Sequence, residues 1–263
     1  MKRFNYGLTA ATIAALALWT GFSTARSQTA TSSAVQQIHP VAAKDDESSY
    51  RQIFDGKTLN GWDGDPKYWR VEDGCLVGEV TPATLLDHNN FIIWRGGTPG
   101  DFELKVEYRI SSRGNSGINY RSVEVPGVPY AMRGYQADID GEERMPETKA
   151  GVRYAGQNYE ERGRTFLAEL GQLTHITSGG IAEVIAPLGD PKELQKYVKS
   201  GDWNDYHLII RNNVLIHILN GHLTSLVIDD DATNRRSDGL IGVQVHVGPP
   251  MKVEYRWFRI KNL

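Results

Sequence analysis

The sequence predicts an all-β protein built as a two-sheet sandwich of jelly-roll type with one short helix. The 263 residues include 27 Gly and 11 Pro, which indicates many turns, and long helical patterns are rare. Roughly a dozen segments alternate apolar and polar residues as half-buried strands do. No repeat of about 20–50 residues is present, so a propeller or a solenoid is not expected.

The N-terminal segment is typical of a secretory signal peptide. Its apolar run, Leu8 to Phe22, follows two basic residues and precedes small residues that offer cleavage after Ala25 or Ser27. We expect residues 1–27 to be removed and the protein to be periplasmic or secreted. An uncleaved membrane anchor is the weaker alternative, because the run is shorter than the ~20 residues that span a bilayer.

Residues 28–50 are rich in Ser, Thr, Ala and Gln and are expected to form a flexible N-terminal tether. The β-sandwich domain is then expected over residues 51–263. Its clearest strand is Phe102–Ile110, where apolar and charged residues alternate strictly, so that one face is buried. Further strands are expected at 118–121, 135–139, 206–211, 214–219, 222–228, 240–247 and 253–260.

Two dipeptides predict tight hairpins. Asp73-Gly74 and Asn220-Gly221 each stand between strand-like segments, where left-handed backbone favours these residues. The single cysteine, Cys75, follows the first turn and excludes an internal disulfide within this chain. The nearby Glu72 and Asp73 would raise the pKa of its thiol, so we expect a buried structural residue rather than a nucleophile.

One helix is expected after Asp190. Asp190 is the predicted N-cap, Pro191 occupies the first helical position and Glu193 completes a capping box. Leu194, Tyr197 and Val198 would then share one buried face, and Gly201 would end the helix.

The charge balance argues against nucleic acid and anionic membranes as partners. There are 29 Lys and Arg against 32 Asp and Glu, a formal net charge of −3. Binding to phosphates needs a basic excess that this chain lacks.

Strand alternation groups polar residues on outward faces. Each set combines amides, acids, Arg or His with glycine: Gly117, Asn119 and Arg121; Gln136, Asp138 and Asp140; Gly242, Gln244 and His246. The last strand would bury Ile241, Val243, Val245 and Val247. Such a composition suits a sugar groove, although a merely solvated sheet face would look similar.

Two loops and one histidine add to this interpretation. The segment 159–164 places Glu160, Glu161, Arg162 and Arg164 within six residues, either as ligand contacts or as surface ion pairs. Asp229–Asp231 is expected to be a solvated turn rather than a calcium loop. His246 stands beside a Gly-Pro-Pro turn, where an imidazole can transfer protons near neutral pH or simply hydrogen-bond the strand end.

The order of several motifs resembles the family called domain of unknown function 1080, or the 3-keto-disaccharide hydrolase domain. The similarity runs from Ile53 to Leu263 through these segments: 54–62 (FDGKTLNGW), 68–74 (YWRVEDG), 101–104 (DFEL), 114–121 (GNSGINYR), 134–139 (GYQADI), 159–164 (YEERGR), 201–206 (GDWNDY), 220–221 (NG) and 246–253 (HVGPPMKV). The insert Val123 to Arg133 departs from the common pattern and bears on the choice of substrate.

The resemblance implies a concanavalin-like double sheet that cleaves glycosides already oxidised to a ketone at C3. The ketone acidifies the C2 proton, so that a base, an enolate stabiliser and a proton donor suffice for β-elimination, followed by hydration. No nicotinamide fingerprint is present, and no cofactor is firmly implied; a divalent metal beside His246 stays open. A dehydrogenase that oxidises sugars at C3 is the expected functional partner.

On this basis His246 is assigned as the proton-transfer or metal-ligating group, with Glu161 and Arg162 as electrostatic partners. The expected substrate-binding residues are Asn119, Arg121, Gln136, Asp138, Tyr159, Arg164 and Gln244. One alternative is a non-catalytic carbohydrate-binding module. The other is a retaining glycosidase that uses Asp138 and Asp140, about 6.6 Å apart by strand rise.

Overall fold

The computed structural model describes residues 47–143 and 153–263, so the predicted signal peptide and residues 28–46 of the tether lie outside the described residues. The end of the predicted tether is not free. Its short helical turn η1 (Glu47–Ser49) is bound to the domain, because the Glu47 carboxylate accepts hydrogen bonds from Lys105 Nζ (2.7 Å) and Arg259 Nη1 (2.6 Å). The folded region therefore begins before the predicted boundary at residue 51.

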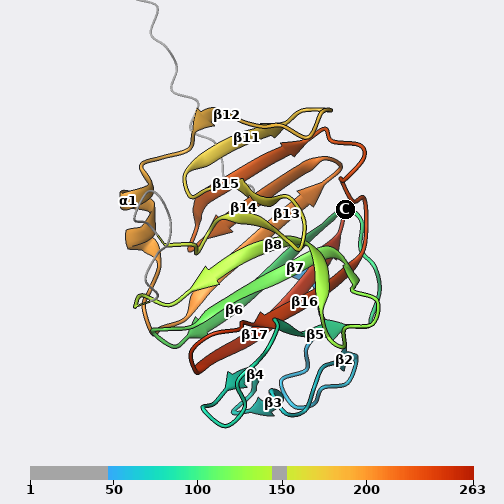
Figure 1. Cartoon of the computed structure of the whole chain (residues 1–263), viewed down its shortest axis with the longest axis vertical. Helices are drawn as coiled ribbons and strands as arrows, with labels where there is room; N and C mark the ends of the chain where they lie inside the picture. The colour runs from blue at the N-terminus through green and yellow to red at the C-terminus, as the bar shows by residue number, and fades with distance from the viewer. Residues whose placement is uncertain (1–46, 144–152) are drawn as a thin grey trace, which may run out of the picture. The chain divides into compact units, whose positions relative to one another are not determined.

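The described residues form two β-sheets, as predicted (Figure 1). The ten-stranded sheet consists of β1 (Arg51–Gln52), β3 (Trp69–Glu72), β4 (Cys75–Val80), β6 (Phe102–Ile110), β11 (Gln172–Ile176), β12 (Ala182–Pro187), β13 (Asn204–Arg211), β14 (Val214–Leu219), β15 (His222–Asp229) and β17 (Met251–Asn262). The seven-stranded sheet consists of β2 (Trp62–Asp63), β5 (Asn90–Trp94), β7 (Asn115–Glu124), β8 (Met132–Asp140), β9 (Asn158–Glu161), β10 (Thr165–Ala168) and β16 (Leu240–Val245).

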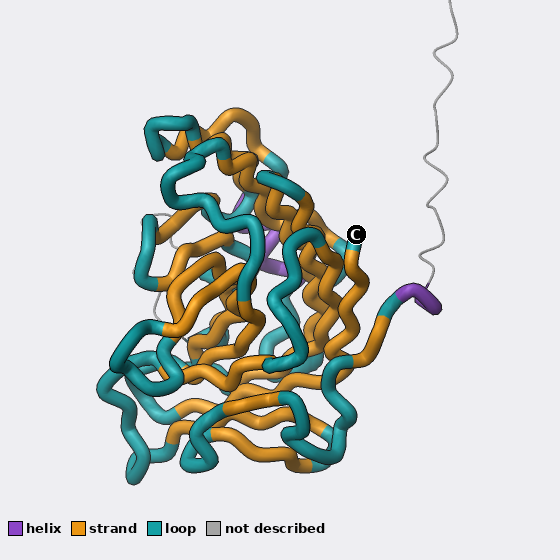
Figure 2. Tube along the Cα trace, turned by 90° about the vertical axis from the view of Figure 1, so that its right-hand side faces the viewer, coloured by secondary structure: helices purple, strands orange, loops and turns teal. Residues whose placement is uncertain are grey.

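The strand orders mix distant parts of the chain, as a jelly roll requires. The larger sheet runs β12-β11-β15-β14-β13-β6-β17-β4-β3, with β1 beside β17, and the smaller runs β10-β9-β8-β7-β16-β5-β2. All described pairs are antiparallel except β11 with β15. Figure 2 shows that strands and loops make up nearly all of the described chain. The sequence missed several short strands, among them β1, β2 and β10.

The core lies where the inward faces of the two sheets meet. Ile118 and Tyr120 of β7 and Leu104 and Val106 of β6 belong to one buried cluster, so the predicted alternation is confirmed. A polar group sits inside it. His217 Nδ1 donates to the Gln157 carbonyl (3.2 Å), and burial lowers the pKa of this imidazole to about 3, which keeps it neutral.

Both predicted hairpins are confirmed. Glu72 pairs with Cys75 across the Asp73-Gly74 turn, and Leu219 pairs with His222 across Asn220-Gly221. Asp73 and Asn220 adopt positive φ angles (both 50°), as these turns demand. Cys75 is buried, and burial raises the pKa of its thiol, in agreement with a structural role.

The helix begins as predicted but is shorter. Asp190 accepts a hydrogen bond from the Lys192 backbone N–H (2.7 Å), and α1 (Pro191–Leu194) passes directly into the 3₁₀ turn η2 (Gln195–Tyr197). The carboxylate of Glu193 pairs with Lys196 (2.7 Å). Tyr197 is exposed, so the prediction that it shares a buried face with Leu194 is wrong.

The strand predicted at 240–247 ends at Val245. Val247 is 39% exposed, so its predicted place in the core is wrong. Within residues 47–143 and 153–263, no helix is long and apolar enough to cross a membrane.

Candidate functional site

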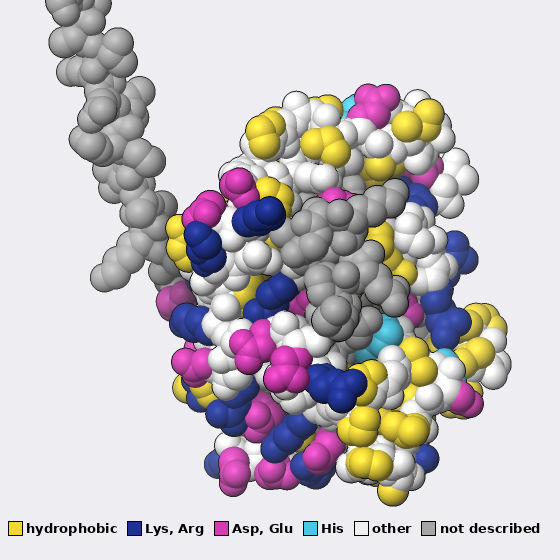
Figure 3. Space-filling model, turned by 60° about the vertical axis from the view of Figure 1, so that its left-hand side comes forward, with side chains coloured by type: hydrophobic (Ala, Val, Ile, Leu, Met, Phe, Trp, Pro, Cys, Tyr) yellow, Lys and Arg dark blue, Asp and Glu magenta, His cyan; other side chains and the backbone are white. Residues whose placement is uncertain are grey.

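A pocket of about 560 Å³ lies on the outer face of the seven-stranded sheet. Its lining comes from β7, β8, β9, β10 and the segments next to β5, β9 and β16: Asn89, Asn115, Gln136, Asp138, Tyr154, Tyr159, Glu161, Arg162, Thr165, Phe166 and His246. Six of the ten residues assigned from the sequence therefore meet here: Gln136, Asp138, Tyr159, Glu161, Arg162 and His246. In the view of Figure 3, acidic and basic side chains are interspersed on the surface.

Two side chains of β8 form part of the pocket lining. Gln136 Nε2 donates to Asp138 Oδ1 (2.7 Å), and Gln244 Nε2 of β16 donates to Gln136 Oε1 (3.2 Å). Gly117 on the neighbouring strand provides the space, since a Cβ there would stand 2.4 Å from the Gln136 carboxamide carbon. The pocket therefore presents a carboxylate and an amide held in fixed orientations, which suits hydroxyl recognition.

Glu161, at the end of β9, is a buried acid that faces this pocket. Its Oε1 accepts a hydrogen bond from Asn89 Nδ2 (3.1 Å) and lies 3.9 Å from Arg162 Nε. Burial raises the pKa of Glu161 above its usual value, against the opposing effects of Asn89, Arg162 and Gln244. A carboxyl with a raised pKa is suited to proton transfer near neutral pH.

His246 directly follows β16 and is half-buried. Its Nδ1 lies 2.5 Å from the Val247 carbonyl oxygen, which can only accept, so Nδ1 carries the proton and the lone pair of the neutral ring is on Nε2. The Val247 N–H in turn donates to Asn89 Oδ1 (3.0 Å). Asn89 thus joins Glu161 to the segment that carries His246.

The β9–β10 side of the pocket is aromatic. The rings of Tyr154 and Phe166 are stacked, with centroids 5.8 Å apart and planes 10° apart, and Tyr159 meets Phe166 edge-on at 5.1 Å. Burial, Glu161 and Asp138 together raise the pKa of Tyr159. Its phenol therefore remains neutral at physiological pH.

Arg121 does not line this pocket, and the prediction that it points outward with Gln136 and Asp138 is wrong. A β-bulge between Tyr120 and Val123 turns Arg121, at φ 43°, into the protein. The buried guanidinium donates to Asp101 (2.9 Å) and to the carbonyls of Gly100 (2.9 Å), Asn212 (2.7 Å) and Arg236 (3.2 Å). It is a structural residue that joins three loops.

Asn119 and Gln244 lie on the outer face of the sheet as predicted, because their strand neighbours Ile118, Tyr120, Val243 and Val245 belong to the core cluster. Both side chains are nevertheless fully buried and do not line the pocket. Asn119 Nδ2 donates to Ser122 Oγ (3.3 Å) at the bulge. Gln244 bonds to Gln136 and therefore positions a lining residue without lining the pocket itself.

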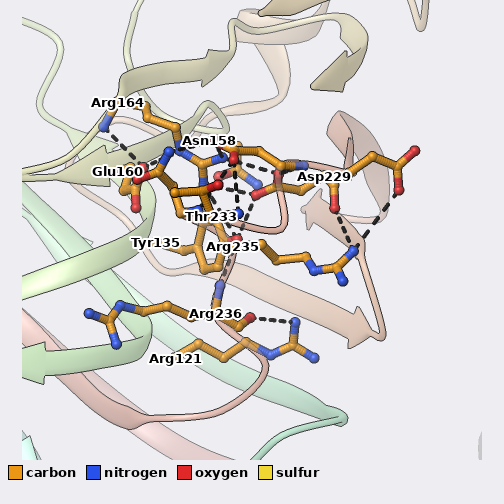
Figure 4. A network of polar contacts seen from close by, with 12 residues as sticks. Arg121, Tyr135, Asn158, Glu160, Arg164, Asp229, Thr233, Arg235 and Arg236 are labelled. Atoms are coloured by element: carbon orange, nitrogen blue, oxygen red, sulfur yellow. Dashed lines mark hydrogen bonds and ion pairs between the residues drawn. The ribbon is translucent and has the colours of Figure 1, made fainter. Parts of the chain in front are cut away.

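Arg164 belongs to a separate buried ion network (Figure 4). Its guanidinium contacts Glu160 (2.6 Å), Asp229 (2.8 Å) and Asp231 (3.3 Å). Asp229 and Asp231 are buried, so the prediction of a solvated Asp229–Asp231 turn holds only for Asp230. Arg164 therefore fixes the loop after β15 to the β9–β10 turn and is not among the residues that line the pocket.

Asp140 is also engaged elsewhere. Its carboxylate accepts hydrogen bonds from Arg153 Nε (3.1 Å) and from the backbone N–H groups of Tyr154 (2.8 Å) and Ala155 (3.2 Å). It is fully buried, so Asp138 and Asp140 do not form the exposed carboxylate pair that a retaining glycosidase would use.

The sequence missed five lining residues: Asn89, Asn115, Tyr154, Thr165 and Phe166. Asn89 and Tyr154 lie in segments without a strand pattern, so alternation could not assign them. Phe166 gave one signal, as an apolar residue two positions after the charged 159–164 segment. Among residues 47–143 and 153–263, no three His, Cys, Asp or Glu side chains are grouped so as to hold a metal ion.

Residues 49–261 match the model of the 3-keto-alpha-glucoside-1,2-lyase-like domain. A 3-keto-disaccharide hydrolase of Bacteroides thetaiotaomicron is 28% identical over 185 residues, which are 65% of this chain. The chain spans 56% of the length of that curated relative.

Solved structures share the fold. Two proposed glycosyl hydrolases from Parabacteroides distasonis align with TM-scores of 0.54 at 17% and 20% identity, covering 81% and 83% of this chain and 99% and 97% of theirs. A Bacillus subtilis protein of unknown function with a galectin-like fold aligns with a TM-score of 0.52 at 14% identity, over 81% of this chain and 98% of its own. These likenesses support the jelly-roll assignment.

Proposed function

Because the chain belongs to the 3-keto-alpha-glucoside-1,2-lyase-like domain family, we propose that it is an enzyme that cleaves 3-keto-glycosides in the pocket above the seven-stranded sheet. One observation carries the assignment. The pocket holds both the His246 imidazole and the Glu161 acid, whose pKa is raised. Asn89 hydrogen-bonds to Glu161 and to the backbone beside His246. Two titratable groups with different environments are the usual basis of paired acid and base roles.

In the proposed reaction, His246 is the base. The C3 ketone acidifies the C2–H bond, and the Nε2 lone pair takes that proton as the electron pair moves to form an enolate. An imidazole suits this step because its ordinary pKa lies close to physiological pH. The neutral tautomer fixed by the Val247 carbonyl is the form that this step requires.

Arg162 and Glu161 complete the elimination. The Arg162 cation at the pocket wall stabilises the negative charge on the C3 oxygen. The enolate then collapses to an enone with a C1=C2 double bond, the C1–O glycosidic bond breaks, and Glu161 gives its proton to the leaving oxygen. Its raised pKa favours the protonated form that this role needs.

Hydration reverses the proton movements. Water adds its oxygen to C1 of the enone, gives one proton to Glu161, and C2 recovers a proton from His246. The products are the free 3-keto-sugar and the alcohol, with no net oxidation or reduction. The substrate must therefore come from a separate sugar dehydrogenase that oxidises C3.

The export of the protein is part of the proposal. The Leu8 to Phe22 run after two basic residues supports cleavage after Ala25 or Ser27 and a periplasmic or secreted product. Intact-mass spectrometry of the protein from its native envelope would find the N-terminus at residue 26 or 28. A mass that still includes Met1 would refute the proposal.

The direct test is to incubate the purified protein with a 3-keto-disaccharide and with the unoxidised parent sugar, with and without a chelator. We expect cleavage of the oxidised sugar alone, with exchange of solvent deuterium into C2 of the product. Cleavage of the parent sugar would instead indicate an ordinary glycosidase. Binding of either sugar without turnover would indicate a carbohydrate-binding module, the second candidate, which the aromatic wall of the pocket also favours.

A further inference from the structure

The aromatic side of the pocket contains a partly exposed hydrophobic surface. Phe166 on β10 is 43% exposed and pairs with Tyr159 of β9, directly before a register shift in the β9–β10 pairing. The Phe166 ring stacks on Tyr154 and makes an edge contact with Tyr159, and these two contacts fix its orientation. An exposed, preordered ring inside a ligand pocket is typical of a binding surface.

The aromatic side chains and the polar groups reach the pocket from different segments. Tyr159 and Phe166 stand on β9 and β10, whereas His246 and Asn89 come from the segments next to β16 and β5, and Asn89 reaches Glu161 at the end of β9. The polar residues Gln136 and Asp138 come from β8. The pocket therefore has an aromatic zone (Tyr154, Tyr159 and Phe166) and a polar zone (Gln136, Asp138 and His246).

Glu161 marks the boundary between the two zones. It lies two positions after Tyr159 on the same face of β9, and its charge acts on the Tyr159 phenol. Through Asn89 it is also tied to the His246 segment. An acid at this boundary is placed to protonate an oxygen that joins one bound ring to another.

We propose that the aromatic zone binds the leaving group of the substrate as a flat ring, so that the enzyme selects 3-keto-glycosides whose aglycone is a second sugar or an aryl group. This inference rests on the proposed function. The oxidised ring must occupy the polar zone, because its C2 proton has to reach His246. The C–H face of a pyranose, or an aromatic ring, then packs on Phe166, while small alkyl aglycones leave this surface uncovered.

The test compares two substrates on two variants. A 3-keto-disaccharide and a methyl 3-keto-glucoside differ only in the leaving group. Phe166→Ala should lower kcat/KM for the disaccharide about threefold to tenfold, mainly through KM, and change the methyl glycoside less than twofold, since one aromatic contact has that value. Phe166→Trp should restore the preference. Trp257→Ala, which removes an exposed ring on β17 outside the pocket, should change neither substrate.

Equal loss on both substrates, or no loss on either, would overturn the aromatic-zone inference while leaving the proposed function intact. Absence of turnover of both substrates by the native protein would instead refute the proposed function. In that case calorimetry with the unoxidised disaccharide and methyl glucoside still decides whether the aromatic zone binds a second ring. A preference for the disaccharide that Phe166→Ala abolishes supports such binding, and equal affinity contradicts it.

Discussion

Asn89 and Glu161, 72 residues apart in the chain, are joined by a 3.1 Å hydrogen bond from Asn89 Nδ2 to Glu161 Oε1. The other end of the same amide accepts the Val247 N–H at 3.0 Å. One uncharged side chain thus orients the buried acid and the backbone beside His246. An amide is suited to this position because it offers both a donor group and an acceptor group without adding charge.

Asn89→Asp should shift the pH dependence of activity. A second carboxylate beside Glu161 disfavours its ionised form, so the pKa of Glu161 rises further. The part of the pH–activity profile that depends on the ionisation of Glu161 therefore shifts to higher pH. We expect kcat to fall about tenfold or more, within the range of a disturbed acid or base. The pH profile of kcat/KM measures this, with the exposed Asn262→Asp as control. An unshifted profile would remove Asn89 from the positioning role.

Glu161→Gln should stabilise the fold at neutral pH while abolishing most activity. The folded-state pKa of Glu161 is raised, so the protonated form favours folding. That contribution is complete below the unfolded pKa of about 4.5 and disappears as the pH rises through the folded pKa. Urea unfolding should therefore show a gain for the variant at pH 7 that shrinks near pH 4. The exposed Glu183→Gln should show no such pH-dependent gain; a variant less stable than the native protein at pH 7 would contradict the burial argument.

His246→Ala should reduce kcat about 10²–10⁴-fold, the usual contribution of a positioned general base. The melting temperature should change little, because the side chain is only half-buried. His175→Ala, which removes a histidine paired with Asp230 outside the pocket, serves as the matched control. Turnover within threefold of the native enzyme on a 3-keto substrate would exclude His246 as the base.

Arg121→Ala should destabilise the protein rather than weaken binding selectively. Its removal leaves three backbone carbonyls and the partly exposed Asp101 carboxylate without this donor, and leaving a buried polar group unsatisfied costs about 1–3 kcal/mol. The midpoint of urea unfolding measures this loss against Arg133→Ala, an exposed arginine on β8. A stable variant with reduced sugar affinity would restore the original assignment of Arg121 to the pocket.

Local sequence patterns predicted those strands and turns whose conformation depends mainly on neighbouring residues. Alternation in β6 and the Asp-Gly and Asn-Gly turns depend on neighbouring residues only, and the structure confirms them. The orientation of Arg121 was predicted wrongly because a bulge in β7 changes which side chains point to each face of the sheet. No alternation rule signals such a bulge in an otherwise regular strand.

Strands β8 and β9 supply four of the six predicted residues that line the pocket, whereas Asn89 and Tyr154 were missed in segments without a strand pattern. Gln136 and Asp138 follow strand phase and lie in the pocket. Arg164 has the same local context as Arg162, yet its partners Asp229 and Asp231 come from the turn after β15. Which guanidinium faces the ligand and which holds a loop therefore depends on contacts that are distant in sequence.

The absence of a side chain at Gly117 limits how this pocket can evolve. Any larger residue there would collide with the Gln136 carboxamide, at 2.4 Å from its carbon, and so displace the partner of Asp138. A substitution at Gly117 forces the Gln136 side chain to move, and it should be tolerated best in a background where Gln136 has already been shortened. The two positions should therefore show strong epistasis, and a search for new sugar specificities should vary them jointly.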